Sequence, residues 1–181
     1  MSQKLYTYVA LMRGLNMGSR NRIKMPVLEQ MFTDATCSDV RSYIQSGNII
    51  FRATPAKAEK IPQLIEARIG ELGFRVPLAV RSAAELAGVV ERNPFLRAGE
   101  SEDRLHVLFL STLPDAASVA ALDPERSPGD RFIVQDREIY LQIQSAADSK
   151  LTNAWFDSKL KTMCTGRNWR TVVTLNEMMK G

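Results

Sequence analysis

Apolar and polar positions along residues 1–81 follow a regular order that predicts alternating strands and helices. Residues 5–12 are apolar or aromatic at both parities, which is typical of a central strand covered on both faces. Ser46-Gly47 has the chemistry of a tight hairpin between two short strands. The predicted elements are, in order, a strand at 5–12, a helix at 27–35, strands at 39–45 and 48–52, a helix at 61–72 and a strand at 76–80.

A capping box at Ser82 and Glu85 predicts the start of a short helix. After this helix the same pattern of strands and helices recurs in the second half of the chain. The predicted elements there are a strand at 106–110, a helix at 115–122, strands at 131–135 and 138–143, a helix at 153–163, an extended piece near Thr165 and a final helix capped by Asn168. The sequence therefore predicts an α+β fold of two ferredoxin-like (βαββαβ) halves in tandem with an extra C-terminal helix. We expect the halves at 1–81 and 105–181, with a helix and linker at 82–104.

Positive charge gathers in the segment that follows the first predicted strand. The chain of 181 residues has 24 Lys and Arg against 20 Asp and Glu, a net charge of +4. Four cations, Arg13, Arg20, Arg22 and Lys24, lie in this one segment, and no carboxylate occurs before Glu29. A basic, glycine-containing loop between a strand and a helix N-terminus is a typical place for an anion to bind.

The composition argues against a disulfide-rich, membrane-spanning or metal-dependent protein. The two cysteines, Cys37 and Cys164, form no CxxC pair, so we expect a cytoplasmic protein without a disulfide framework. No stretch approaches the apolar length of a membrane helix, and the N-terminus lacks the pattern of a signal peptide. The single histidine, His106, excludes mechanisms that need two, and we expect neither a metal nor a cofactor.

Geometry predicts where a ligand would bind. In a split βαβ unit the first two strands run parallel, so the basic loop and the 45–48 hairpin lie at the same end of the sheet. The predicted ligand-binding residues are Arg13, Asn16, Arg20, Asn21, Lys24, Gln45, Ser46 and Asn48. The glycines and asparagines of these segments are also explained by turn conformations alone. The cations are not explained in this way, because a turn does not require them.

Arg13 is the residue for which the pattern makes the sharpest prediction. It ends a buried strand, so its charge must be paired or reach the surface. We predict that its guanidinium points into the cleft between the loop and the hairpin, near Gln45 or Asn48. The alternative is that it bonds backbone carbonyls and locks the loop.

A second patch is predicted near the C-terminus, where residues 150–170 carry five cations against Asp157. Arg167, Asn168 and Trp169 form its centre, and the indole could stack on a ligand or serve as a packing anchor.

Three functions fit these features. The first is a site for a phosphorylated or carboxylated small molecule, held by cations and oriented by amides. The second is a nucleic-acid-binding module whose basic loop and C-terminal cations track phosphates. The third is a non-catalytic scaffold or interaction domain. No phosphate-loop, dinucleotide, metalloprotease or hydrolase motif is present, and no general base is identifiable, so catalysis and the oligomeric state are left open.

Three ordered blocks carry a family resemblance. They are Tyr8 to Gly18, Tyr43 to Asn48, and Arg167-Asn168-Trp169 followed by Thr171. The chain resembles the bacterial domain-of-unknown-function family 1697 over essentially its whole length. This resemblance implies two ferredoxin-like α+β halves, and it implies no established activity, cofactor or catalytic residue.

Overall fold

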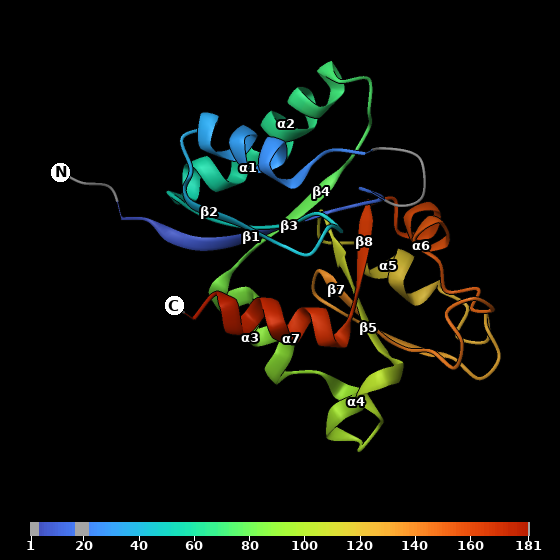
Figure 1. The fold of residues 1–181 in the computed structure, drawn as a ribbon. Helices are drawn as coiled ribbons and strands as arrows, with labels where there is room; N and C mark the ends of the chain where they lie inside the picture. Colours follow the sequence, from blue (N-terminus) through green and yellow to red (C-terminus); the bar gives the residue numbers. More distant parts are fainter. Residues whose placement is uncertain (1–3, 17–21, 181) are drawn as a thin grey trace. The chain divides into compact units, whose positions relative to one another are not determined.

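The computed structural model describes residues 4–16 and 22–180, which divide into two compact units (Figure 1). The first unit comprises Met1–Leu86 and Leu175–Gly181, and the second comprises Ala87–Thr174. Each contains one four-stranded sheet in which every neighbouring pair of strands is antiparallel. The fold is therefore α+β, with two units of the same strand order. No described helix is long and apolar enough to cross a membrane.

The first unit has the element order that its hydrophobic pattern predicts. Its elements are β1 (Tyr6–Met12), α1 (Met25–Asp34), β2 (Ser38–Tyr43), β3 (Asn48–Ala53), α2 (Pro55–Glu71) and β4 (Leu78–Ser82). The sheet order is β2-β3-β1-β4, so β1 is central, as predicted. Because β3 lies antiparallel between β1 and β2, the segments after β1 and β2 leave the sheet at the same end.

The core of the first unit lies between this sheet and the pair α1 and α2, which cover one of its faces (Figure 1). Phe32 and Ile65 reach inward from the two helices and are fully buried. Phe51 of β3 meets them, and its ring lies 5.7 Å from that of Tyr8. Phe32 and Phe51 are fully buried core residues, so their rings are not available to stack on nucleic-acid bases, whereas Tyr8 is half-buried.

The hairpin between β2 and β3 is wider than the tight turn predicted at Ser46-Gly47. β2 ends at Tyr43, which pairs with Asn48, so residues 44–47 all lie in the turn. The buried Asn48 side chain closes it, since its Nδ2 donates to the carbonyl of Tyr43 at 3.1 Å and to the Ser46 hydroxyl at 3.0 Å. Gly47 has a φ of +77°, and a Cβ there would lie 2.8 Å from the Cβ of Met12. Glycine is therefore required by both conformation and space.

The second unit repeats the sheet order as β6-β7-β5-β8. The remaining elements are α3 (Ala83–Glu91), α4 (Pro94–Arg97), a 3-10 turn (Glu102–Arg104), β5 (Leu105–Leu110), α5 (Ala116–Ala120), β6 (Arg131–Gln135), β7 (Glu138–Gln142), α6 (Asn153–Leu160), β8 (Cys164–Asn168) and α7 (Trp169–Met178). Helices α5 and α6 cover one face of this sheet, with Leu122, Phe156 and Leu160 in its core. The unit boundaries fall within α3 and α7.

Two predicted helix starts are confirmed. The Ser82 backbone N–H donates to the Glu85 carboxylate at 2.7 Å, and the Glu85 N–H donates back to the Ser82 hydroxyl at 3.3 Å, which is a capping box. The Asn168 side-chain oxygen accepts from the Thr171 N–H at 2.8 Å and caps α7.

Candidate functional site

Asn16 holds the loop after β1 against the 44–47 turn. Its side-chain Nδ2 donates to the carbonyl of Gln45 at 3.0 Å and to the carbonyl of Ile23 at 2.9 Å. Its Oδ1 accepts from the Ile23 N–H at 2.8 Å. The residue sits at φ +55°, a left-handed conformation that asparagine tolerates well. Asn16 is therefore a positioning residue, because its amide is already engaged by the protein.

A pocket opens beside this tie, at the N-terminal end of α1. It has a volume of about 650 Å³. The described residues that line it are Asn16, Arg22, Ile23, Lys24, Met25, Pro26 and Gln45. Arg22 and Lys24 are exposed, and no carboxylate occurs among these lining residues.

The electrostatics of this pocket favour a negative ligand. Lys24 is the N-cap residue of α1, so its positive charge adds to that of the N-terminal end of the helix dipole. Arg22 adds a second cation two residues earlier. Ile23, Met25 and Pro26 supply an apolar surface beside the charges. The two cations are suited to an anionic group. The apolar residues beside them are suited to an apolar part of a ligand.

The other predicted ligand-binding residues have different positions. Ser46 and Asn48 close the turn, and Asn48 is fully buried. Arg13 is half-buried, its backbone N–H donates to the carbonyl of Pro77 at 2.9 Å, and it is not among the described lining residues. Arg20 and Asn21 lie outside the described residues. Arg22 lines the pocket but was not among the predicted ligand-binding residues. Its position in the same basic loop as Arg20 and Lys24 could have indicated it.

The residues of the predicted second patch are largely buried in the second unit. Arg167 is 8% exposed, and its guanidinium donates to the Thr165 hydroxyl at 3.0 Å and to the carbonyl of Gly166 at 2.7 Å. Burial lowers the pKa of Arg167 to about 10. Trp169 is 1% exposed, and the Asn168 side chain caps α7. Packing and capping thus engage all three, although Asn168 and Trp169 border a depression of about 410 Å³.

The second unit has hydroxyl groups where the first has its basic loop. The Arg13 N–H bonds the carbonyl of Pro77 before β4, and the Ser111 N–H bonds the carbonyl of Met163 before β8 at 2.8 Å. Ser111 is thus the counterpart of Arg13. Its hydroxyl lies 3.0 Å from that of Thr162. The segment after β5, residues 111–115, contains no Lys or Arg, unlike the basic loop after β1.

Fold and site together define an α+β protein of two similarly ordered antiparallel units, with a cationic pocket in the first. The chain belongs to the family described as "Protein of unknown function (DUF1697)", whose profile matches residues 5–140.

A solved structure has a similar fold. The conserved bacterial protein SP0830 from Streptococcus pneumoniae aligns with a TM-score of 0.75 at 24% sequence identity. The alignment covers 98% of this chain and 100% of that one. The search of curated proteins found no match.

Proposed function

We propose that the cationic pocket of the first unit binds a phosphorylated or carboxylated small molecule. The observation that carries this proposal is the pairing of Arg22 and Lys24 on a concave surface whose described lining residues include no carboxylate. A volume of about 650 Å³ lies within the range of small-molecule sites. The N-terminal end of α1 adds its dipole to the two charges.

Each residue has a separate task in this proposal. Arg22 and Lys24 bind the anion, and the Gln45 side chain orients a polar group of the ligand. Asn16, Ser46 and Asn48 hold the loop and the turn in place. Arg13 and Arg20 add to the positive charge of the loop, and Asn21 offers an amide to the ligand, as the sequence predicts. The Arg167-Asn168-Trp169 patch is proposed as an accessory surface at most, because packing already engages its side chains.

We also propose that both units are ferredoxin-like halves of a cytoplasmic protein, with residues 82–104 as the connection between them. The matching strand orders support the first point, since an antiparallel sheet ordered second-third-first-fourth suits a βαββαβ chain. The two cysteines are free and buried, which supports a reducing compartment.

A nucleic-acid-binding module and a non-catalytic scaffold are the alternatives. The cations of the loop would serve phosphates of either a small molecule or a polynucleotide. The concave surface of the pocket favours the small molecule, because a surface that follows a nucleic-acid backbone is an extended groove.

Isothermal titration calorimetry and thermal unfolding test the proposal with inorganic phosphate, AMP, glucose 6-phosphate and citrate. A ligand at 100 times its Kd should raise the free energy of unfolding by about 2.7 kcal/mol. The R22Q/K24Q variant should lose this binding, whereas Lys60→Gln, an exposed lysine of α2 in the same unit, should retain it. Equal affinity in R22Q/K24Q and the wild type would overturn the proposal.

A further inference from the structure

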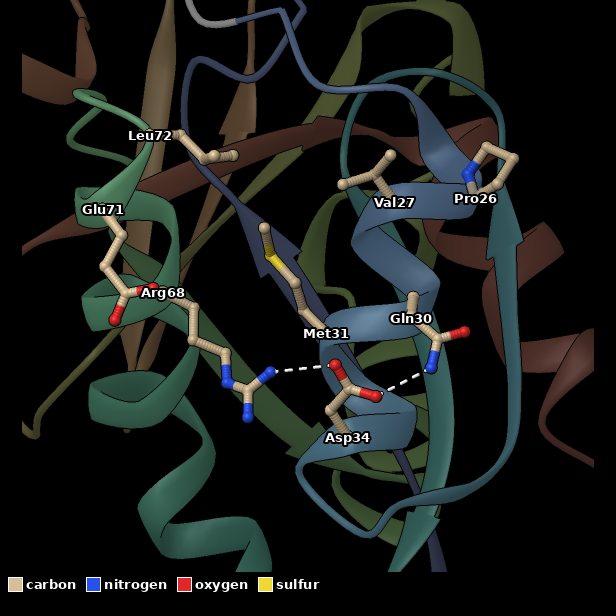
Figure 2. A pocket seen from close by; sticks show the side chains of 8 residues that line it. All are labelled: Pro26, Val27, Gln30, Met31, Asp34, Arg68, Glu71 and Leu72. Atoms are coloured by element: carbon tan, nitrogen blue, oxygen red, sulfur yellow. Dashed lines mark hydrogen bonds and ion pairs between the residues drawn. The ribbon is translucent and has the colours of Figure 1, made fainter.

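A second depression lies directly beside the cationic pocket and shares Pro26 with it. It is a groove of about 450 Å³ between α1 and α2, shown in Figure 2. Pro26, Val27, Met31 and Leu72 form its apolar part, which occupies the end nearest Pro26. Both depressions lie within the first unit, so their relative position follows from one compact body.

The apolar part of the groove is unusually open to solvent. Val27 is 46% exposed and Leu72 is 49% exposed, although they face each other across the groove from two helices. Covering such side chains with an apolar ligand group is favourable, because it removes apolar surface from water. These two residues therefore provide a hydrophobic surface for part of a ligand.

The other end of the groove is polar and closed by an ion pair. Arg68 of α2 lies 3.1 Å from the Asp34 carboxylate of α1, and the Gln30 side chain donates to Asp34 at 2.7 Å (Figure 2). The hydrogen bond from Gln30 lowers the pKa of Asp34, so this carboxylate is charged at neutral pH. Glu71 is exposed on the α2 wall at the negative end of its helix. Two carboxylates against the one guanidinium of Arg68 leave this end with a net negative charge, which disfavours a second anion.

We propose that the two depressions bind one amphiphilic anion, with its charged head at Arg22 and Lys24 and a short apolar chain across Pro26. The chain lies on Val27, Met31 and Leu72. The charged half of this inference rests on the proposed function, and the apolar half rests on the groove. A phosphate or carboxylate carrying an alkyl or aryl body is the ligand class, and the net negative charge of Asp34, Glu71 and Arg68 disfavours a second terminal anion.

The groove also limits the length of the chain. The apolar surface runs along α1 from Pro26 to Met31, which spans about 7.5 Å at the helical rise per residue and accommodates roughly six extended methylene groups. Beyond Met31 the chain meets the Asp34–Arg68 ion pair. Affinity should therefore rise with chain length and then level off.

Calorimetry with the full chain tests the inference, using inorganic phosphate and methyl, butyl, hexyl and decyl phosphate below their micelle concentrations. We expect the affinity to rise about two- to fourfold per methylene group up to hexyl phosphate. Decyl phosphate should gain little more. Hexane-1,6-diyl bisphosphate should bind more weakly than hexyl phosphate, because its second anion meets Asp34 and Glu71.

Two variants separate the head site from the chain site. V27S/L72S should weaken hexyl phosphate binding about tenfold or more and leave inorganic phosphate binding unchanged. Leu64→Ser is the matched control, since Leu64 is 40% exposed on α2 and does not line the groove. Lys24→Gln should weaken every member of the series.

The outcomes distinguish this inference from the function on which it rests. Binding of inorganic phosphate that depends on Lys24, without any effect of chain length, would leave the proposed function standing and overturn the inference. Failure of every phosphate and of citrate to bind would overturn both. Hexyl phosphate binding that is independent of Lys24 would reject the shared site. Binding to phosphatidic acid vesicles without binding to free hexyl phosphate would also reject it.

Discussion

The side-chain amide of Asn16 donates a hydrogen bond of 3.0 Å to the backbone carbonyl of Gln45, a residue 29 positions later in the chain. This bond joins the basic loop after β1 to the turn between β2 and β3. Both segments border the cationic pocket, so this side chain helps to position its wall, together with the backbone hydrogen bond of 2.9 Å from the Met12 N–H to the carbonyl of Gly47.

Replacing Asn16 tests this positioning role. Asn16→Ala removes the hydrogen bonds to Ile23 and Gln45 and places alanine at φ +55°. We expect a loss of about 1–3 kcal/mol in the free energy of unfolding. Asn16→Asp retains the acceptor for the Ile23 N–H but places a carboxylate oxygen against the carbonyls of Ile23 and Gln45, so it should lose at least as much. Thermal unfolding measures both, and an Asn16→Ala variant as stable as the wild type would contradict this role.

Alanine substitutions at Gly47 and Gly14 separate the cost of a positive φ from the cost of a close contact in the 44–47 turn. Both have positive φ, +77° and +69°, but only at Gly47 would a Cβ approach another atom, the Cβ of Met12 at 2.8 Å. Gly14→Ala should cost about 1–2 kcal/mol through conformation alone. Gly47→Ala should cost more by about 1–3 kcal/mol, because the contact forces the backbone to shift. Urea unfolding compares the two, and equal losses would show that the close contact is relieved without cost.

Arg13→Lys separates the two roles predicted for Arg13. We expect a lower melting temperature with ligand affinity nearly unchanged, because Arg13 is half-buried and lies outside the described lining of the pocket. A lysine keeps the charge but cannot reproduce the planar fork of donors. Melting curves and phosphate titrations should be run on the same preparation. Lost affinity with an unchanged melting temperature would instead support a direct contact with the anion.

His106 should make stability depend on pH in a narrow window. Burial lowers its pKa below the usual 6.5, opposed by a hydrogen bond with the backbone of Arg104. The unfolded chain therefore binds the proton more readily, so stability is full above the unfolded pKa and falls as the pH drops through it. We expect a lower free energy of unfolding at pH 5.5 than at pH 7.5.

The control for this prediction is His106→Gln, since the chain contains no other histidine. The difference between the two pH values should shrink in this variant. The same difference in the variant and the wild type would assign the effect to other groups.

The nucleic-acid alternative makes its own prediction about salt. Binding to duplex DNA should weaken with a log-log slope of about −0.9 for each phosphate that the protein contacts. Fluorescence anisotropy at increasing salt concentration measures this slope. We expect no duplex binding at low salt, because the cations line a pocket rather than an open groove. A steep slope that R22Q/K24Q reduces would favour the nucleic-acid module instead.

The sequence by itself predicted an α+β fold and the order of strands and helices in the first unit. Apolar residues at both parities of 5–12 required a strand covered on both faces, and β1 is central in its sheet. Two helix starts were predicted correctly, one from Ser82 and Glu85 and one from Asn168 before α7. Such starts can be recognised in the sequence because capping involves residues only three positions apart. The same topology correctly placed the basic loop beside the β2–β3 turn.

Only the tertiary structure decided what each polar residue does. Asn16, Asn48 and Arg167 had the chemistry of ligand contacts, but each hydrogen-bonds to protein groups. Asn48 and Arg167 bond groups within five positions in the sequence, whereas the Gln45 carbonyl that Asn16 bonds lies 29 positions away. That this carbonyl comes within about 3 Å of the Asn16 amide is set by packing between distant segments. The groove beside Pro26 is equally non-local, because its walls come from two helices whose separation only the folded core fixes.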